Sequence, residues 1–101
     1  MPLDFSNVTG FQWDGGNATK SLSKHRVTTQ EAEEVFADPA LKVLEDAAHS
    51  AGEARWKVFG TTAGARFLTI SFTIRGTFLR VISARPMSRK ERKAYEQKDN
   101  A

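Results

Sequence analysis

The two histidines of this sequence, His25 and His49, are its side chains best suited to proton transfer. An imidazole changes charge near neutral pH, so it can act as a general base or a general acid on a substrate hydroxyl. His25 directly follows Lys24 and is favoured for this reason, whereas His49 stands in a run of small residues that indicates a surface loop. A histidine at a helix end can instead interact with the last carbonyl groups, so a structural role for His25 stays open.

Glu53 is the alternative base. It stands two residues before Arg55, so both side chains lie on the same face of an extended strand. Such a pair could serve catalysis, and it could equally be a structural ion pair.

Arg80 and Arg85 are the side chains expected to stabilise negative charge on a reacting phosphate, because a guanidinium presents a bidentate fork of donors. Both belong to a predicted strand that runs through Val81 and Ile82. Strict alternation along this strand places Arg80 on one face and Arg85 on the other. Either arginine could instead pair with a carboxylate elsewhere in the chain.

A short basic helix is expected directly after that strand. Ser88 and Glu91 form a capping-box pattern, so the helix begins after Ser88. Its turns offer almost nothing apolar beyond Ala94 and Tyr95, which indicates either a solvated tail or a surface that meets a negative partner. Tyr95 could stack on a base, although packing against the sheet is the favoured role.

The formal net charge is only +3, but the charges are unevenly distributed. Seven cations and two carboxylates lie between Arg80 and Lys98, whereas seven carboxylates and one lysine lie between Glu31 and Glu53. This asymmetry indicates a phosphate-binding end and an opposite end that repels nucleic acid. A merely solvated charged surface would also explain both runs.

The elements that must position these residues begin with a short strand at 11–13 and a helix. Asp14 is suited to cap that helix, which we expect to end at about His25, with Ala18, Leu22 and His25 at helical spacing.

A second helix is expected to follow. Thr28 and Glu31 form another capping box, which opens a helix through about Ala37. Its apolar stripe consists of Ala32, Val35 and Phe36.

Strands follow at 41–46, 54–61 and 66–75, and a tight return at Gly76 leads into the strand that carries the two arginines. Consecutive hairpin-linked strands indicate a small antiparallel sheet with helices on one face, hence an α+β fold. Because the chain shows no internal repeat and no linker, we expect a single domain over residues 1–101, with an ordered core at about 11–97.

One face of the 66–75 strand carries Thr69, Ser71 and Thr73. These small hydroxyl residues could form a shallow floor for a phosphodiester. Threonine and serine are also common on exposed strands, and a one-residue slip in register exchanges the faces, so both interpretations stay open. The cations that could converge around such a floor are Arg55, Lys57, Arg80 and Arg85.

Composition excludes several classes of protein. A chain of 101 residues with 40% hydrophobic residues is long and apolar enough for one folded domain and is not typical of a disordered chain. The absence of cysteine excludes a disulfide framework and the usual zinc-finger site, and we expect neither a cofactor nor a bound metal. No signal peptide or transmembrane helix is visible, so a cytoplasmic location is the simplest expectation.

Several short motifs follow one another in a characteristic order. They are Phe11-Gln12-Trp13-Asp14, Lys24-His25, Glu31-Ala32, Val35-Phe36, Asp38-Pro39, Glu53-Ala54-Arg55, Gly60, Ile82-Ser83-Ala84-Arg85 and Glu91-Arg92 with Tyr95. In this order and spacing, over about residues 11–95, the chain resembles the BrnT family, toxins of bacterial type II toxin–antitoxin pairs with a RelE-like fold.

The resemblance implies a ribonuclease that inhibits translation and bacterial growth and is neutralised by a BrnA-like antitoxin. RNA cleavage without a metal needs a base for the 2′-hydroxyl, an acid for the 5′-oxygen and cations around the phosphorane. Nothing in the sequence resembles a helix-turn-helix reader, so operator DNA is expected to be bound only through the antitoxin complex.

These considerations give a set of candidate site residues. The catalytic candidates are His25, Glu53, Arg55, Arg80 and Arg85. The candidates for RNA binding are Lys24, Lys57, Arg89, Lys90, Arg92, Lys93 and Tyr95.

The chain departs from the usual BrnT pattern at three positions. The family usually has a lysine where Asn17 stands, an asparagine where Ser21 stands and a glycine where Arg26 stands. The change at Asn17 is expected to weaken RNA contact by the first helix, which Arg26 could partly compensate. The change at Ser21 removes an amide that could hold the turn at Lys24-His25.

Two other classes of function remain open. The chain could be a non-catalytic protein whose basic surface docks an acidic antitoxin, or a nucleic-acid-binding module that helps the complex bind DNA. Alanine at Arg80 or Arg85 should separate these from catalysis, because a catalytic arginine can be lost without loss of fold or antitoxin affinity.

Overall fold

The computed structural model describes residues 5–46 and 52–97 as an α+β fold, as expected from the sequence. Its helical elements are the 3-10 turn η1 (Phe5–Asn7) and the helices α1 (Gly15–His25), α2 (Thr29–Val35) and α3 (Arg89–Glu96). Its strands are β1 (Gly10–Gln12), β2 (Lys42–Glu45), β3 (Trp56–Thr61), β4 (Phe67–Arg75) and β5 (Phe78–Pro86). No helix among these residues is long and apolar enough to cross a membrane.

The five strands form one sheet in the order β1-β5-β4-β3-β2. Strands β2 to β5 pair antiparallel as predicted, but β1 pairs parallel to β5, with Phe11 opposite Leu79. The predicted antiparallel sheet is therefore confirmed for these four strands, and β1 adds one parallel pairing that makes the whole sheet mixed. Hairpin reasoning could not reach β1, because two helices and three strands separate it from its partner along the chain.

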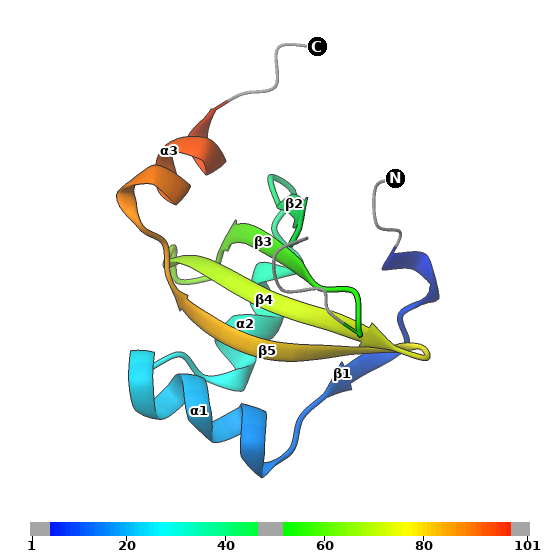
Figure 1. The fold of residues 1–101 in the computed structure, drawn as a ribbon. Coiled ribbons are helices and arrows are strands. Elements are labelled where there is room, and N and C mark those ends of the chain that lie inside the picture. Colours follow the sequence, from blue (N-terminus) through cyan, green and yellow to red (C-terminus); the bar gives the residue numbers. More distant parts are fainter. Residues whose placement is uncertain (1–4, 47–51, 98–101) are drawn as a thin grey trace.

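Helices cover the sheet from both sides. Figure 1 shows α1 and α2 below the sheet and α3 above it, at the end of β5. The core lies between the sheet and the lower helices. Its fully buried members are Val27, Ala32, Val35, Val58, Leu68, Ile70, Phe72, Leu79, Val81 and Ala84. The opposite face of the sheet is contacted by α3 at one end and by Ala54 at the other, and we call it the open face.

Each of the three helices begins with a capping box. Asp14, Thr28 and Ser88 accept hydrogen bonds from backbone N–H groups of the first turns, and the third residue of each helix bonds back to the cap. Such boxes satisfy N–H groups that have no partner inside a helix. The starts of all three helices are therefore confirmed as predicted.

The buried face of α1 is polar. Leu22, one of the residues whose helical spacing predicted this helix, is 48% exposed, whereas Asn17 and Ser21 are almost fully buried. Helical periodicity counts apolar residues, and here the inward residues are polar because their partners are backbone groups of β5.

At the end of α1 lies Arg26, one of the positions where the chain departs from the BrnT pattern that it resembles. Arg26 adopts a left-handed conformation with φ of 54° and ψ of 39°. A helix often ends on a residue of this kind, usually glycine, because a Cβ atom is strained there. Arg26 therefore occupies a position that favours the glycine usual in the family. Its carbonyl accepts a hydrogen bond from Arg66 Nη1 at 2.9 Å.

Gly60 allows α2 to approach β3 closely. A Cβ atom at this position would lie 2.8 Å from Val35 Cγ1 and 3.2 Å from the carbonyl oxygen of Val35. We expect Gly60→Ala to lower the free energy of unfolding by about 1–3 kcal/mol, as overpacking of a core does. Thermal or urea unfolding measures this change.

Gly64→Ala is the matched control, because a Cβ atom there meets Thr62 Oγ1 at an ordinary 3.8 Å. Equal stability of both variants would contradict the close approach of α2 and β3.

Candidate active site

A β-bulge in β5 decides which side chains reach the open face. Ser71 of β4 pairs with Ser83, but the next residue, Phe72, pairs with Val81, so Ile82 is an extra residue in β5. A bulge of this kind shifts the alternation of side chains by one position. The residues of β5 before and after Ile82 therefore follow different alternation patterns.

The bulge places both arginines of β5 on the open face. Arg80 lies opposite Thr73, and Arg85 lies opposite Thr69. Directly opposed residues share a face, and Thr69 and Thr73 share one by alternation along β4. The prediction that Arg80 and Arg85 lie on opposite faces was therefore wrong, because it assumed an unbroken strand.

Two buried polar side chains of α1 hold the bulge from the core side. Asn17 Nδ2 donates to the carbonyl of Val81 at 2.9 Å, and Ser21 Oγ accepts from the N–H of Ala84 at 2.8 Å. These backbone groups flank Ile82 on both sides. Asn17 Nδ2 also donates to the carbonyl of Gln12, which connects α1 to the end of β1. Asn17 is 4% exposed, although it lines a hollow of the open face.

Two adjoining hollows cross the open face, and Lys20, Arg55 and Ile82 line both of them. The first hollow, of about 210 Å³, is lined by Lys20, Asp46, Arg55, Lys57, Ser71, Ile82, Ser83 and Arg85. The second, of about 340 Å³, is lined by Gly16, Asn17, Lys20, Glu53, Arg55, Arg75, Arg80, Val81 and Ile82. Each hollow contains four cations and one carboxylate.

The expected floor of hydroxyl residues is only partly open. Thr69 and Thr73 are each 1% exposed, and only Ser71 of the three lines a hollow. Thr69 Oγ1 donates to Glu91 of α3 at 3.0 Å, and Thr73 Oγ1 donates to the carbonyl of Ala54 at 2.7 Å. Alternation identified the face correctly, but it could not predict which segments would cover its two ends.

Arg85 connects β5 to α3. Its Nη1 and Nη2 atoms donate to the two carboxylate oxygens of Glu91 at 2.6 and 2.7 Å. Glu91 also accepts from Thr69 and from the N–H of Ser88. The hydrogen bond from Arg85, reinforced by those from Ser88 and Thr69, outweighs burial and lowers the pKa of Glu91 to about 2.

Arg80 connects β5 to α1. Its Nη1 atom donates to Asp14, the N-cap of α1, at 2.9 Å. This bond, followed by those from the N–H groups of Asn17 and Gly16, lowers the pKa of Asp14. Asp14 and Glu91 are thus the acids that pair with the two arginines.

Glu53 lines the second hollow but pairs with Arg75 rather than with Arg55. Arg75 Nε donates to Glu53 Oε2 at 2.9 Å. This hydrogen bond lowers the pKa of Glu53, and the charges of Arg55 and Arg80 act in the same direction. Glu53 is therefore an ionised carboxylate beside three arginines.

His25 lines neither hollow. It is the last residue of α1, one turn beyond Ser21, and its carbonyl accepts a bond from Arg66 Nη2 at 3.4 Å. Lys24 is exposed on the same helix and also lines neither hollow. His49 lies outside the described residues.

The cations of α3 surround one end of the open face. Arg89, Lys90 and Lys93 are exposed. The Arg92 guanidinium lies 3.9 Å from the centre of the Phe67 ring, a cation–π contact that attaches the helix to β4. None of these four side chains lines either hollow.

Tyr95 attaches α3 to the rest of the fold, as favoured from the sequence. Its hydroxyl donates to Asp38 Oδ2 at 2.6 Å, and its ring meets Phe67 edge-on. Burial, followed by the hydrogen bond to Asp38, raises the pKa of Tyr95.

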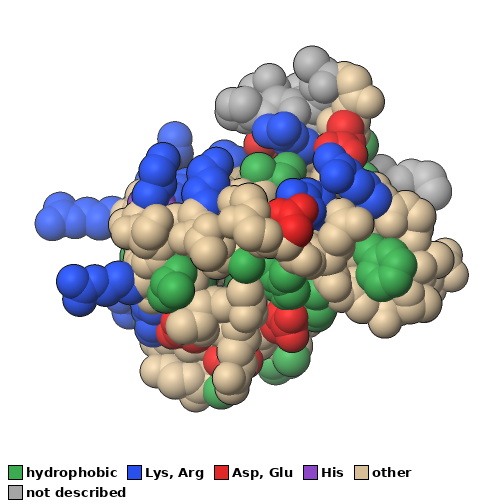
Figure 2. Space-filling model, turned by 90° about the horizontal axis from the view of Figure 1, so that it is seen from below, with side chains coloured by type: hydrophobic (Ala, Val, Ile, Leu, Met, Phe, Trp, Pro, Cys, Tyr) green, Lys and Arg blue, Asp and Glu red, His purple; other side chains and the backbone are tan. Residues whose placement is uncertain are grey.

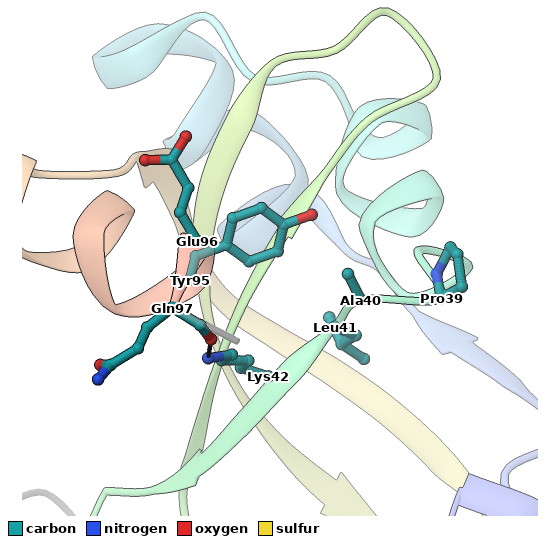
Figure 3. A pocket seen from close by; sticks show the side chains of 7 residues that line it. All are labelled: Pro39, Ala40, Leu41, Lys42, Tyr95, Glu96 and Gln97. Carbon is teal, nitrogen blue, oxygen red and sulfur yellow. Dashed lines mark hydrogen bonds between the residues drawn. The ribbon is translucent and has the colours of Figure 1, made fainter. Parts of the chain in front are cut away.

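A third hollow, of about 450 Å³, lies beside Tyr95, between α3 and the residues from Pro39 to Lys42 (Figure 3). It is larger than either hollow of the open face, and Lys42 is the one lysine that lines it. Lys42 Nζ donates to the carbonyls of Ala94 and Gln97, which lie at the C-terminal end of α3. This lysine therefore attaches α3 to β2.

Lys20 and Arg75 are cations of the hollows that sequence reasoning missed. Lys20 lies one turn after Gly16 on α1, and Gly16 also lines the second hollow. The spacing of Lys20 and Lys24 at i and i+4 could have indicated a cationic helix face. Figure 2, seen from the side of α1 and α2, shows Lys and Arg side chains gathered along the margin where α1 lies.

We expect Ser21→Ala to lower the free energy of unfolding by about 1–3 kcal/mol, because the buried N–H of Ala84 loses its acceptor. Amide hydrogen exchange at residues 81–84 should accelerate as well. Ser23→Ala, an exposed change on the same helix, is the matched control. If both variants behave alike, Ser21 does not hold the bulge.

The pairing of Glu91 predicts a pH dependence of stability. Because its folded-state pKa of about 2 lies below the usual 4.5, the ionised carboxylate stabilises the fold above about pH 4.5, and this stabilisation is lost as the pH falls toward 2. Native protein should therefore exceed Glu91→Gln in stability at pH 6 by about 1–3 kcal/mol, and by less at pH 3. Glu45→Gln, an exposed change, should show no such pH-dependent difference. If the difference in stability between native protein and Glu91→Gln stays constant with pH, the ion pair of Glu91 with Arg85 is contradicted.

Comparison with known families identifies the family of this chain. No curated protein matches the chain at a significant level. The family model described as "Ribonuclease toxin, BrnT, of type II toxin-antitoxin system" matches residues 13–91. The match includes α1, the bulge of β5 and Glu91, and so all residues that line the two hollows. The chain therefore belongs to the BrnT family, the ribonuclease toxins of type II toxin–antitoxin systems.

Proposed function

We propose that this protein is a metal-independent endoribonuclease that cleaves RNA on the open face of its sheet. The observation that supports this most is the convergence of Arg55, Lys57, Arg80 and Arg85 around two adjoining hollows. Such a concentration of positive charge attracts a phosphodiester backbone and stabilises additional negative charge on it. The proposal assigns the reaction to side chains alone, and no three His, Asp or Glu side chains gather as metal ligands within residues 5–46 and 52–97.

The reaction is an attack of the RNA's own 2′-hydroxyl on the neighbouring phosphorus. A base takes the proton of the 2′-hydroxyl, a bond forms between that oxygen and phosphorus, and the bond to the 5′-oxygen breaks. The 5′-oxygen leaves with a proton from an acid or from water. Cations around the phosphorane lower the barrier because its charge exceeds that of the substrate.

Glu53 is the base that the geometry favours. It lines the same hollow as Arg55 and Arg80, and its lowered pKa keeps the carboxylate ionised at neutral pH. His25, the other candidate, lies at the end of α1 outside both hollows. We therefore place His25 beside the path of the RNA strand and assign the first proton transfer to Glu53.

The arginines of β5 have two roles in this proposal. Arg80 and Arg85 raise the positive potential of the hollows, and they also attach α1 and α3 through Asp14 and Glu91. Alanine at either position would loosen a helix as well as remove a charge. Such variants therefore cannot separate catalysis from structure.

The peripheral cations extend the site along the RNA. In this proposal four exposed cations guide the RNA backbone. They are Lys24 on α1 and Arg89, Lys90 and Lys93 on α3. Arg92 and Tyr95 contribute by holding α3 against β4, because both contact Phe67.

The biological part of the proposal follows from membership of the family. RNA cleavage by this chain inhibits translation and growth in the cytoplasm, and a BrnA-like antitoxin neutralises it by covering the same cations. Operator DNA is bound only by the complex, through the antitoxin.

We expect Glu53→Gln to reduce the cleavage rate by about 10²–10⁴-fold, the range of a lost general base. Stability should change little, because the Glu53–Arg75 pair is exposed and such pairs contribute little. The measurement is single-turnover cleavage of an RNA oligonucleotide, together with growth and RNA integrity after induction of each variant. Glu45→Gln, which removes an exposed carboxylate of β2, is the matched control.

The pH profile separates the two candidate bases. With Glu53 as the base, the rate should not fall between pH 8 and pH 5, because its pKa lies below the usual 4.5. An imidazole base would give a falling rate near neutral pH. The cleavage rate should also be unchanged by a metal chelator.

Normal growth and intact RNA after induction of folded native protein would contradict the ribonuclease proposal.

A further inference from the structure

The arginines around the two hollows already have partners. Arg75 bonds Glu53, Arg80 bonds Asp14, and Arg85 bonds both oxygens of Glu91. Arg55 also makes interactions of its own. A phosphate that binds one of these guanidinium groups must compete with a carboxylate or share the group with it.

Lys20 and Lys57 differ from the arginines in this respect. Both line the first hollow, and neither makes a hydrogen bond or an ion pair among the residues that the structure describes. Among the described residues, an incoming phosphate therefore has no bonded side chain or carbonyl to displace from their ammonium groups. Such a contact keeps more of its binding energy than one that first breaks an existing charge-assisted hydrogen bond.

The two lysines approach the first hollow from opposite sides. Lys20 projects from α1, which packs along β5, and Lys57 lies on β3, two strands away from β5. Adjacent strands are about 4.8 Å apart, so the space between the lysines spans roughly 10 Å of sheet, about the size of one phosphate group with its oxygen contacts. Lys57 lies directly opposite Ser71, which in turn lies opposite Ser83. Ser71 and Ser83 line the same hollow, on the two strands that lie between Lys57 and α1.

Lys20 also lines the second hollow, which contains Glu53. Lys20, like Ile82, therefore lies at the boundary between the first hollow, whose floor contains Ser71 and Ser83, and the second hollow, which contains Glu53. From this juxtaposition we propose that Lys20 and Lys57 bind one RNA phosphate over the Ser71–Ser83 floor, and that Lys20 also contacts the next phosphate along the strand, in the hollow of Glu53. The paired arginines act at longer range by raising the potential.

This inference rests on the proposed function only for the identity of the polyanion as RNA. It assigns Lys20 to the site and gives the unpaired lysines, rather than the arginines, the direct contacts with phosphate. A binding experiment can therefore test it separately from cleavage.

The test measures binding of a 2′-O-methyl RNA oligonucleotide, which cannot be cleaved through its 2′-oxygen, by fluorescence anisotropy at several salt concentrations. Lys20→Gln and Lys57→Gln should each weaken binding by about tenfold, the loss expected for one charge-assisted contact. The slope of log K against log salt should fall by about 0.7 for each lysine. Lys20→Arg should retain most of the affinity.

Lys24→Gln is the matched comparison, because it removes the same charge from the same helix, one turn away and outside both hollows. Its effect on affinity should be at least threefold smaller than that of Lys20→Gln. Unchanged thermal unfolding of all variants shows that the comparison concerns binding.

The outcomes separate this inference from the proposed function. If Lys20→Gln weakens binding no more than Lys24→Gln, or if the native protein does not bind the oligonucleotide, the assignment of Lys20 is wrong. If the native protein binds as expected but leaves unmodified RNA intact, the ribonuclease proposal fails and the phosphate contact of Lys20 is supported.

Discussion

The single extra residue in β5 is the constraint on which the candidate site depends. Without Ile82 as a bulge, Arg80 and Arg85 would lie on opposite faces, and one of them would point into the core. The pairing of β5 with β1 ends at Arg80, and beyond it Asn17 donates to the carbonyl of Val81 and Ser21 accepts from the N–H of Ala84. Buried backbone groups require such partners. The polar face of α1 and the bulge therefore lie at the same stretch of β5.

The charged side chains of the candidate site also attach helices to the sheet. Each arginine of β5 is bonded to the capping box of a helix, Arg80 to the N-cap of α1 and Arg85 to the third residue of α3. A carboxylate at a helix N-terminus is favoured by the helix dipole, so these acids are stable where they stand. They also offset part of the positive charge of the hollows. The surface combines firmly placed, paired arginines with two lysines that have no such partner among the described residues.

Local chemistry predicted much of this structure. The capping boxes at Thr28 and Ser88 were visible as residue pairs, and hydrophobic alternation identified β4 and its two faces. The features that could not be predicted are contacts between distant parts of the chain. The parallel pairing of β1, the bulge at Ile82 and the acids that bond the arginines each depend on segments that lie far apart in the chain. Lys20 was missed for the same reason, because only the packing of α1 along β5 brings it to the hollows.

The departures from the family pattern in α1 preserve the hydrogen bonds that the bulge needs. Position 17 must supply a donor to the carbonyls of Gln12 and Val81, and an ammonium as well as an amide can donate to both. Position 21 must supply an acceptor to the N–H of Ala84, and the amide oxygen of asparagine could take the place of Ser21 Oγ. Asn17 Oδ1 also accepts from the N–H of Asp14 at 2.7 Å, so a lysine at position 17 would keep the donor role but lose this acceptor. In this chain Lys20 carries the positive charge of α1 on the rim of both hollows, while Asn17 and Ser21 make the contacts that hold β5.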